Sequence, residues 1–152
     1  MPKGRTTPPD ELERFLAAQE GVFDSALGEL RRGRKRSHWM WFMFPQLRGL
    51  GRSETAWRYG LDGAEEAAAY LGHPVLGPRL TQAAEAMLAH RGVAPEAVLG
   101  PVDALKLRSS ASLFAAVPGA PEVFAGILAA FYGRQPCPRT LAMLSGVRDG
   151  RS

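Results

Sequence analysis

The chain has 152 residues, of which 45% are hydrophobic and 22% charged, and its net charge is +4. This balance is typical of a globular domain, and no apolar run reaches the roughly 18 residues that a membrane-spanning helix needs. The first residues lack the apolar stretch of a signal peptide, and a single cysteine, Cys137, excludes an internal disulfide. We therefore expect one cytoplasmic domain in which Cys137 is a spectator rather than a nucleophile.

The positive charge is concentrated at one place in the chain. Arginines or lysines occupy five of the six positions from 31 to 36, and the rest of the chain has 14 basic residues against 15 acidic ones. The basicity therefore marks one site and not a uniformly cationic surface. The chain also has 16 arginines but only three lysines. A position that keeps lysine in such a chain indicates a need for a compact ammonium group, which singles out Lys35 and Lys106.

The N-terminal part predicts a tail and then a long helix. Residues 1–9 are rich in proline and are expected to be flexible, as is the tail over 146–152, with one helical domain over 10–145 between them. Asp10 is a candidate N-cap, and apolar residues at spacings of three and four predict an amphipathic helix over about 10–32 that ends at Gly33. Gln19 falls on its apolar face, so its amide needs a hydrogen-bond partner, in the simplest case a neighbouring backbone group.

The segment from His38 to Phe44 is apolar on every side of a helical wheel, which predicts a buried helix at the centre of the fold. A buried strand is the alternative, because an aromatic run of this length is ambiguous by period alone. Pro45 ends either element.

The rest of the chain predicts further helices, several of which begin at a proline. Ser53 is expected to cap a short helix, and an element opening at His73-Pro74 follows the next one. The predicted helices cover 54–59, 64–71, 74–88, 95–99, 102–117, 123–132 and 138–144. We therefore predict an all-α fold, a compact multihelical domain of about seven helices packed around the central aromatic helix.

Candidate site residues occur on the predicted helix that begins at Pro101. Asp103, Lys106 and Ser110 are spaced to share one face, next to Ser109. The simpler interpretation is a surface ion pair between Lys106 and Asp103; the functional one is a cation facing a pocket, where the serine hydroxyls donate to a phosphate or carboxylate.

The histidines and aromatic residues also have two interpretations. His38 is either a core histidine with a satisfied ring or the acid/base of a ligand pocket. The aromatic residues beside it, such as Trp39, are core residues or stacking faces for a base. His38, His73 and His90 are scattered and form no metal-ligand spacing, so we predict no metal and no cofactor.

Several blocks of the sequence resemble one known family. The run Gly33–Gln46 (GRKRSHWMWFMFPQ), followed by Gly49-Leu50-Gly51 and Ser53, resembles the signature of a small bacterial family, domain-of-unknown-function family 1810. The resemblance covers about residues 12–145. Its other blocks are Ala18-Gln19, residues 73–80, residues 103–110, and the ending with Phe131, Gly133 and Thr140-Leu141. Ala111-Ser112 departs from an expected Met-Thr pair, which should not disturb the fold.

The resemblance implies a compact multihelical domain with a central buried helix, and no established activity. Relatives often carry the label calpastatin, which does not fit, because a calpain inhibitor of that kind is a long, polar, disordered chain.

The family blocks contain more polar residues than a simple core requires. We hypothesise that these residues converge on one pocket for an anionic ligand, nucleotide-like or ADP-ribose-like, with hydrolysis or group transfer as the reaction if there is one. His38 and Lys106 are the catalytic candidates, and the ligand-binding candidates are Gln19, Lys35, Trp39, Gln46, Ser53, Ser109 and Ser110.

The alternative hypothesis is a non-enzymatic module that uses the basic run Arg31–Arg36 to contact nucleic acid or an acidic protein. In that run, we expect Lys35 to turn inward while its arginine neighbours stay in water, because the run adjoins a buried segment.

Overall fold

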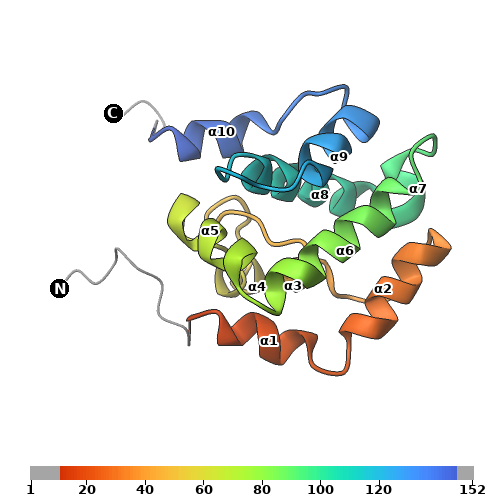
Figure 1. Ribbon diagram of the computed structural model, residues 1–152, viewed down its shortest axis with the longest axis horizontal. Helices are drawn as coiled ribbons and strands as arrows, with labels where there is room; N and C mark the ends of the chain where they lie inside the picture. The colour runs from red at the N-terminus through yellow and green to blue at the C-terminus, as the bar shows by residue number, and fades with distance from the viewer. Residues whose placement is uncertain (1–10, 147–152) are drawn as a thin grey trace.

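The computed structural model describes residues 11–146, and within this range the backbone forms ten helices and no strand (Figure 1). The predicted all-α class is confirmed, whereas the predicted number of about seven helices is too low. None of the described helices is both long and apolar enough to cross a membrane. The predicted tail over 1–9, the cap Asp10 and the residues after Gly146 lie outside the described residues. The helices are α1 (Glu13–Gln19), α2 (Phe23–Arg32), α3 (Met40–Met43), α4 (Glu54–Arg58), α5 (Ala64–Gly72), α6 (Leu76–Leu88), α7 (Pro95–Leu99), α8 (Pro101–Ala115), α9 (Val123–Phe131) and α10 (Pro138–Leu144).

The single helix predicted over 10–32 is two helices in the structure. α1 ends at Gln19 and α2 begins at Phe23, with Gly21 between them at a φ of 71°. A left-handed residue interrupts the helical hydrogen bonds, and glycine adopts that conformation without steric cost. The predicted end of the second helix is confirmed, because Gly33 is its left-handed C-cap with a φ of 76°.

Proline at the start of helices was predicted correctly at three sites. Pro95, Pro101 and Pro138 each occupy the first turn of their helix, where the missing N–H costs no hydrogen bond. His73 also acts near a helix start, although α6 begins three residues later than it. Its Nδ1 accepts hydrogen bonds from the backbone N–H groups of Val75 and Leu76 at 3.1 and 3.2 Å.

Most positions of the segment His38–Phe44 are buried, as predicted, but the segment does not form one continuous helix. Only α3, one turn, is helical, and His38 is exposed. Pro45 disfavours helical backbone at the residue before it, and Phe44 accordingly adopts a φ of −129° and a ψ of 76°. Trp39 and Phe44 are nevertheless buried, at 0% and 2% exposure.

The central position belongs to α8. It packs against α5, α7, α9 and α10, and in Figure 1 it lies between α9 and α10 on one side and α5 and α6 on the other. Every residue from Ser109 to Phe114 is buried. A helix that is buried over nearly its whole circumference is a core helix, so its serines need partners within the protein.

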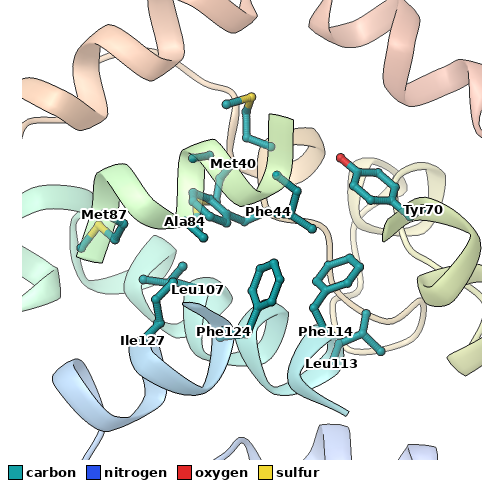
Figure 2. Packing of buried hydrophobic residues seen from close by; sticks show 14 of the residues in the cluster. Met40, Phe44, Tyr70, Ala84, Met87, Leu107, Leu113, Phe114, Phe124 and Ile127 are labelled. Atoms are coloured by element: carbon teal, nitrogen blue, oxygen red, sulfur yellow. The ribbon is translucent and has the colours of Figure 1, made fainter. Parts of the chain in front are cut away.

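A series of aromatic rings in mutual contact connects four helices through this core. The ring centroids lie 5.1 Å apart from Phe15 to Tyr70, 5.6 Å from Tyr70 to Phe114 and 5.6 Å from Phe114 to Phe124. Figure 2 shows Phe114 and Phe124 beside one another below the helix that carries Ala84. Pairs in this range contribute about 0.5–1.5 kcal/mol each beyond their buried area. The aromatic cluster therefore holds α1, α5, α8 and α9 together.

The basic loop over 33–39 is fixed by one buried carboxylate, that of Glu29 on α2. Its oxygens accept hydrogen bonds from the backbone N–H of Arg36 at 2.8 Å and of Ser37 at 3.0 Å, from the Ser37 hydroxyl at 2.6 Å, and from the Trp39 indole N–H at 2.8 Å. The loop is thus anchored from its inner side, and this anchoring sets the position of Lys35.

Candidate functional site

A hollow with a volume of about 350 Å³ lies where α8, the start of α10 and the segment that follows α3 meet. Small-molecule sites in proteins commonly measure roughly 300–1,000 Å³, so this volume suits a small ligand. We call it the basic pocket. Its lining residues are Trp41, Gln46, Leu50, Gly51, Val102, Leu105, Lys106, Arg108, Ser109, Cys137 and Arg139.

Lys106 is held in the wall of the basic pocket by two contacts. Its Nζ lies 3.1 Å from Oδ1 of Asp103, one helical turn earlier, and 3.8 Å from the centre of the Trp41 ring. The lysine side chain is 18% exposed. Both interpretations of Lys106 therefore describe part of the geometry: the ion pair with Asp103 exists, and the ammonium group also faces a pocket.

The two lysines singled out by composition meet at the same carboxylate. Lys35 Nζ lies 2.9 Å from Oδ2 of Asp103, and Lys106 Nζ lies 3.1 Å from Oδ1. The predicted inward turn of Lys35 is confirmed, because its side chain is 10% exposed while Arg34 and Arg36 are exposed. Lys35 also donates to the carbonyl of Ser37 at 2.6 Å. Two ammonium groups on one carboxylate leave one positive charge uncompensated at this side of the pocket.

Two arginines complete the cationic wall. Arg108 donates to the carbonyls of Gln135 and Pro136 at 2.8 and 3.2 Å, which fixes the loop that leads into α10. Arg139 donates to the carbonyl of Leu50 at 3.3 Å and so connects α10 to the segment after α3. Among the described residues that line the pocket, three are cationic and none is a carboxylate.

Serine hydroxyls on α8 position Cys137 at the start of α10. The backbone N–H of Cys137 donates to Ser112 Oγ at 2.8 Å, and Ser109 Oγ lies 3.6 Å from Cys137 Sγ. Burial by itself would raise the pKa of the Cys137 thiol. Donor groups of Thr140, Ser109 and the Arg139 backbone near the sulfur outweigh it and lower the pKa below its ordinary value. At a given pH, a larger fraction of Cys137 is therefore in the thiolate form than of a free cysteine.

Gln46 brings an amide into the basic pocket. A parallel bridge between Leu47 and Leu61 holds this part of the chain, and Leu61 N–H donates to the Gln46 carbonyl at 2.9 Å. The Gln46 residue is 8% exposed and lines the pocket, and its side chain makes no hydrogen bond with any other described residue. A nearly buried amide without a protein partner is suited to bind a ligand or water in the pocket.

Six of the nine predicted site residues do not line the basic pocket: Lys35, described above, and five others. Gln19 is part of the core: its Nε2 donates to the Phe42 carbonyl at 2.8 Å and to the Tyr70 hydroxyl at 3.2 Å, and its Oε1 accepts from Arg79 at 3.1 Å. The simpler interpretation of Gln19, a buried amide bound to a neighbouring backbone group, matches this geometry. Burial raises the pKa of Tyr70 in the same cluster, against the opposing effects of Gln19 and Arg79.

The other four have distinct environments. Trp39 is fully buried, Ser53 caps α4 by accepting a hydrogen bond from the Ala56 N–H at 3.0 Å, and His38 is exposed. Ser110 is 1% exposed, and its hydroxyl has no partner among the described residues. The basic pocket therefore brings together Lys106, Ser109 and Gln46 from the predicted set, with Lys35 behind Asp103.

Sequence reasoning missed four pocket residues: Trp41, Arg108, Cys137 and Arg139. Trp41 was one of the aromatic residues interpreted as core residues or stacking faces and was not selected as a site residue, and it is only partly buried. Arg108 could have been noticed as a cation inside a block shared with the family, and Arg139 directly precedes Thr140-Leu141 of another block. Nothing in the spacing connects Cys137 to Ser109, because the chain reverses between α8 and α10.

A second hollow, of about 610 Å³, lies between α5, α6 and the turn after α8, and none of its described lining residues is charged. We call it the apolar pocket. Within residues 11–146, no three His, Cys, Asp or Glu side chains are grouped so that they could hold a metal ion. The basic pocket is therefore the candidate site with polar chemistry.

The fold and the pocket define an all-helical protein with a small cation-lined cavity. The chain belongs to the family described as "Protein of unknown function (DUF1810)", whose model matches residues 9–144. The chain is also similar to the conserved hypothetical protein Rv1873 from Mycobacterium tuberculosis, whose crystal structure was determined at 1.38 Å. That chain is 49% identical, the match covers 91% of this chain and 99% of the other, and the TM-score is 0.88. A comparison with curated proteins found no match.

Proposed function

We propose that the basic pocket binds a small anionic ligand that carries a phosphate or carboxylate group. The observation that carries the proposal is the charge of the wall, where Lys106, Arg108 and Arg139 face one cavity without a lining carboxylate. Cations gathered at a partly enclosed site attract anions more strongly than the same charges spread over a surface.

The remaining wall residues favour a ligand with a planar or polar part beside its charge. The ring of Trp41 offers a stacking face, and Gln46 and Ser109 offer polar groups for orientation. A volume of about 350 Å³ fits a mononucleotide or a sugar phosphate. An ADP-ribose-like ligand is larger and would extend beyond the cavity.

The proposal concerns binding, and hydrolysis or group transfer is not assigned to the pocket. General acid–base catalysis most often uses a histidine or a carboxylate within hydrogen-bond reach of the reacting atoms. The described lining residues include no histidine, aspartate or glutamate, and exposed His38 is not one of them. Lys106 remains as the group that neutralises the charge of the ligand.

Replacing Lys106 with methionine is expected to weaken anion binding about tenfold or more, because a charge-assisted hydrogen bond contributes about 1.5–3 kcal/mol. Methionine keeps much of the packing against Trp41 and removes the charge. The measurement is a thermal-shift screen with nucleotides and sugar phosphates, in which a ligand at a hundred times its Kd stabilises the folded state by about 2.7 kcal/mol. Arg91→Ala, an exposed cation outside the pocket wall, is the control of equal charge change. Equal stabilisation of the wild type and Lys106→Met would contradict the proposal.

The alternative of a nucleic-acid or acidic-protein module has one supporting observation, the exposure of Arg31, Arg32, Arg34 and Arg36. If it is correct, replacing the first three with alanine makes the salt dependence of DNA or RNA binding weaker. The slope of the logarithm of the binding constant against the logarithm of the salt concentration decreases in magnitude by about 0.9 per lost phosphate contact. Lys106→Met then has no effect on that binding. Titrations at several salt concentrations measure the slope, and an unchanged slope in the triple variant rejects this alternative.

A further inference from the structure

The basic pocket contains a nucleophile that the anion-binding proposal does not use. Cys137 lines the cavity, is only partly buried, and is the sole cysteine of the chain. Its sulfur lies 3.6 Å from the Ser109 hydroxyl, and the wall around it carries Lys106, Arg108 and Arg139. Hydrogen-bond donors near a sulfur favour its thiolate form, which is the reactive one.

A second observation points to a ligand at the same place. The Gln46 residue is 8% exposed and lines the pocket, and its amide has no hydrogen-bond partner among the described residues. A polar side chain that is more than nine-tenths buried and lacks a protein partner is free to hydrogen-bond a group that enters the cavity from outside. The cavity thus combines a thiol, cations and an amide that is open to the cavity.

We propose that Cys137 is a reactive thiol that undergoes exchange with small anionic disulfides bound in the basic pocket. This inference rests on the proposed function, because the same cations hold the charge of the disulfide. Thiol–disulfide exchange suits this wall since it requires only a thiolate, an oriented disulfide and a leaving thiolate. Hydrolytic chemistry also requires a base to activate water, and the described lining residues offer no histidine or carboxylate for that purpose.

The step is balanced without a further reactant. The Cys137 thiol loses its proton to solvent, and its sulfur attacks one sulfur of the bound disulfide. The S–S bond of the ligand breaks, a new S–S bond joins Cys137 to the attacked sulfur, and the other sulfur leaves as a thiolate with the electron pair. The disulfide is the oxidant. A thiol from solution reverses the modification when it attacks the mixed disulfide.

The test compares disulfides of opposite charge on the intact protein at neutral pH. The probes are dithiobis(nitrobenzoate), a dianion, and cystamine, a dication, with release of one equivalent of thiolate and the mass of the adduct as readouts. Relative to N-acetylcysteine, the protein is expected to prefer the anionic probe by at least about tenfold, the lower end of electrostatic enrichment in a charged cleft. Cys137→Ser removes the reaction, Lys106→Met reduces the preference several-fold, and Arg91→Ala leaves it unchanged.

The outcomes separate this inference from anion binding itself. A preference equal to that of N-acetylcysteine, or one that persists in Lys106→Met, overturns the reactive-thiol proposal. Cys137→Ser is then examined with inorganic phosphate in the thermal-shift assay. Stabilisation that depends on Lys106 shows that anion binding stands and only the thiol chemistry fails. Absence of both the charge preference and the phosphate effect rejects the proposed function as well.

Discussion

Replacing Glu29 with alanine is expected to destabilise the protein by about 3–4 kcal/mol, because it leaves several donors around a buried site without an acceptor. The carboxylate accepts four hydrogen bonds from the loop over 33–39, among them one from the fully buried Trp39 indole. Water cannot replace the acceptor at Trp39 without opening the core. Chemical denaturation measures the change in the free energy of unfolding.

Glu29→Gln is the matched variant, since it keeps the shape and one acceptor oxygen. Its NH₂ group faces donors of the loop, so we expect an intermediate loss of about 2 kcal/mol. A loss equal to that of alanine would mean that shape contributes nothing, and a loss near zero in both variants would contradict the described network.

The same carboxylate predicts an acid-sensitive component of stability. Burial of Glu29 would raise its pKa, but hydrogen bonds from the Ser37 hydroxyl, the Arg36 and Ser37 backbone and Trp39 outweigh burial and lower the pKa from 4.5 to about 2. A depressed pKa stabilises the folded state fully above the unfolded value and loses that contribution as pH falls through the folded value. The stability difference between wild type and Glu29→Gln is therefore expected to stay constant above about pH 5 and to fall from about 2 kcal/mol to near zero on acidification to pH 2. A difference that does not change with pH excludes Glu29 as the acid-sensitive group.

Glu29 also connects the fold to the candidate site. The loop that it anchors carries Lys35, whose ammonium group shares Asp103 with Lys106. If the loop loosens, Lys35 leaves Asp103, and the carboxylate then neutralises Lys106 more completely. We therefore infer that the buried network under the basic loop helps to keep positive charge available in the basic pocket.

Local signals in the sequence predicted most helices because each depends on a few neighbouring residues. Pro95, Pro101 and Pro138 begin helices, and Gly33 ends one, through the backbone geometry of proline and glycine alone. The break at Gly21 was missed because the apolar period continues on both sides of it. Periodicity reports which face is buried and does not report a change of helix direction.

The prediction of a helix over the central segment failed because tertiary packing determines the backbone there. Trp39 and Phe44 are as buried as predicted, but irregular, non-helical backbone on either side of α3 achieves that burial. Helical and irregular segments bury aromatic side chains equally well, so composition could not decide between them. The fixed position of the Trp39 indole depends on Glu29, ten residues earlier, and that contact leaves no pattern in the sequence.

Site residues could be predicted where a residue type is scarce in the chain or where the residue lies in a block shared with the family. They could not be predicted where only folding brings distant residues together. The scarcity of lysine identified Lys35 and Lys106, and the structure joins both through Asp103. Cys137 and Arg139 enter the same pocket only because the chain turns back after α9 and places α10 against α8. Sequence distance conceals such a contact, and one sequence alone does not reveal it.

Substituting Gly77 with alanine is expected to destabilise the protein by about 3 kcal/mol, at the upper end of the range for overpacking. A Cβ at Gly77 would lie 2.0 Å from the carbonyl oxygen of Leu71, near the end of α5. The obstructing atom belongs to backbone, so no side-chain rotation relieves the overlap, and α6 must move away from α5.

Gly72→Ala is the control, because a Cβ there meets no atom within 4 Å. Alanine in place of an exposed glycine at a helix end gains or loses less than about 1 kcal/mol. Denaturation of both variants gives the comparison. Equal stability of the two variants would show that α5 and α6 do not approach as closely as described. A loss of stability in Gly77→Ala alone shows that the close contact between α5 and α6 requires a residue without a side chain at this position. These two helices form one side of the apolar pocket.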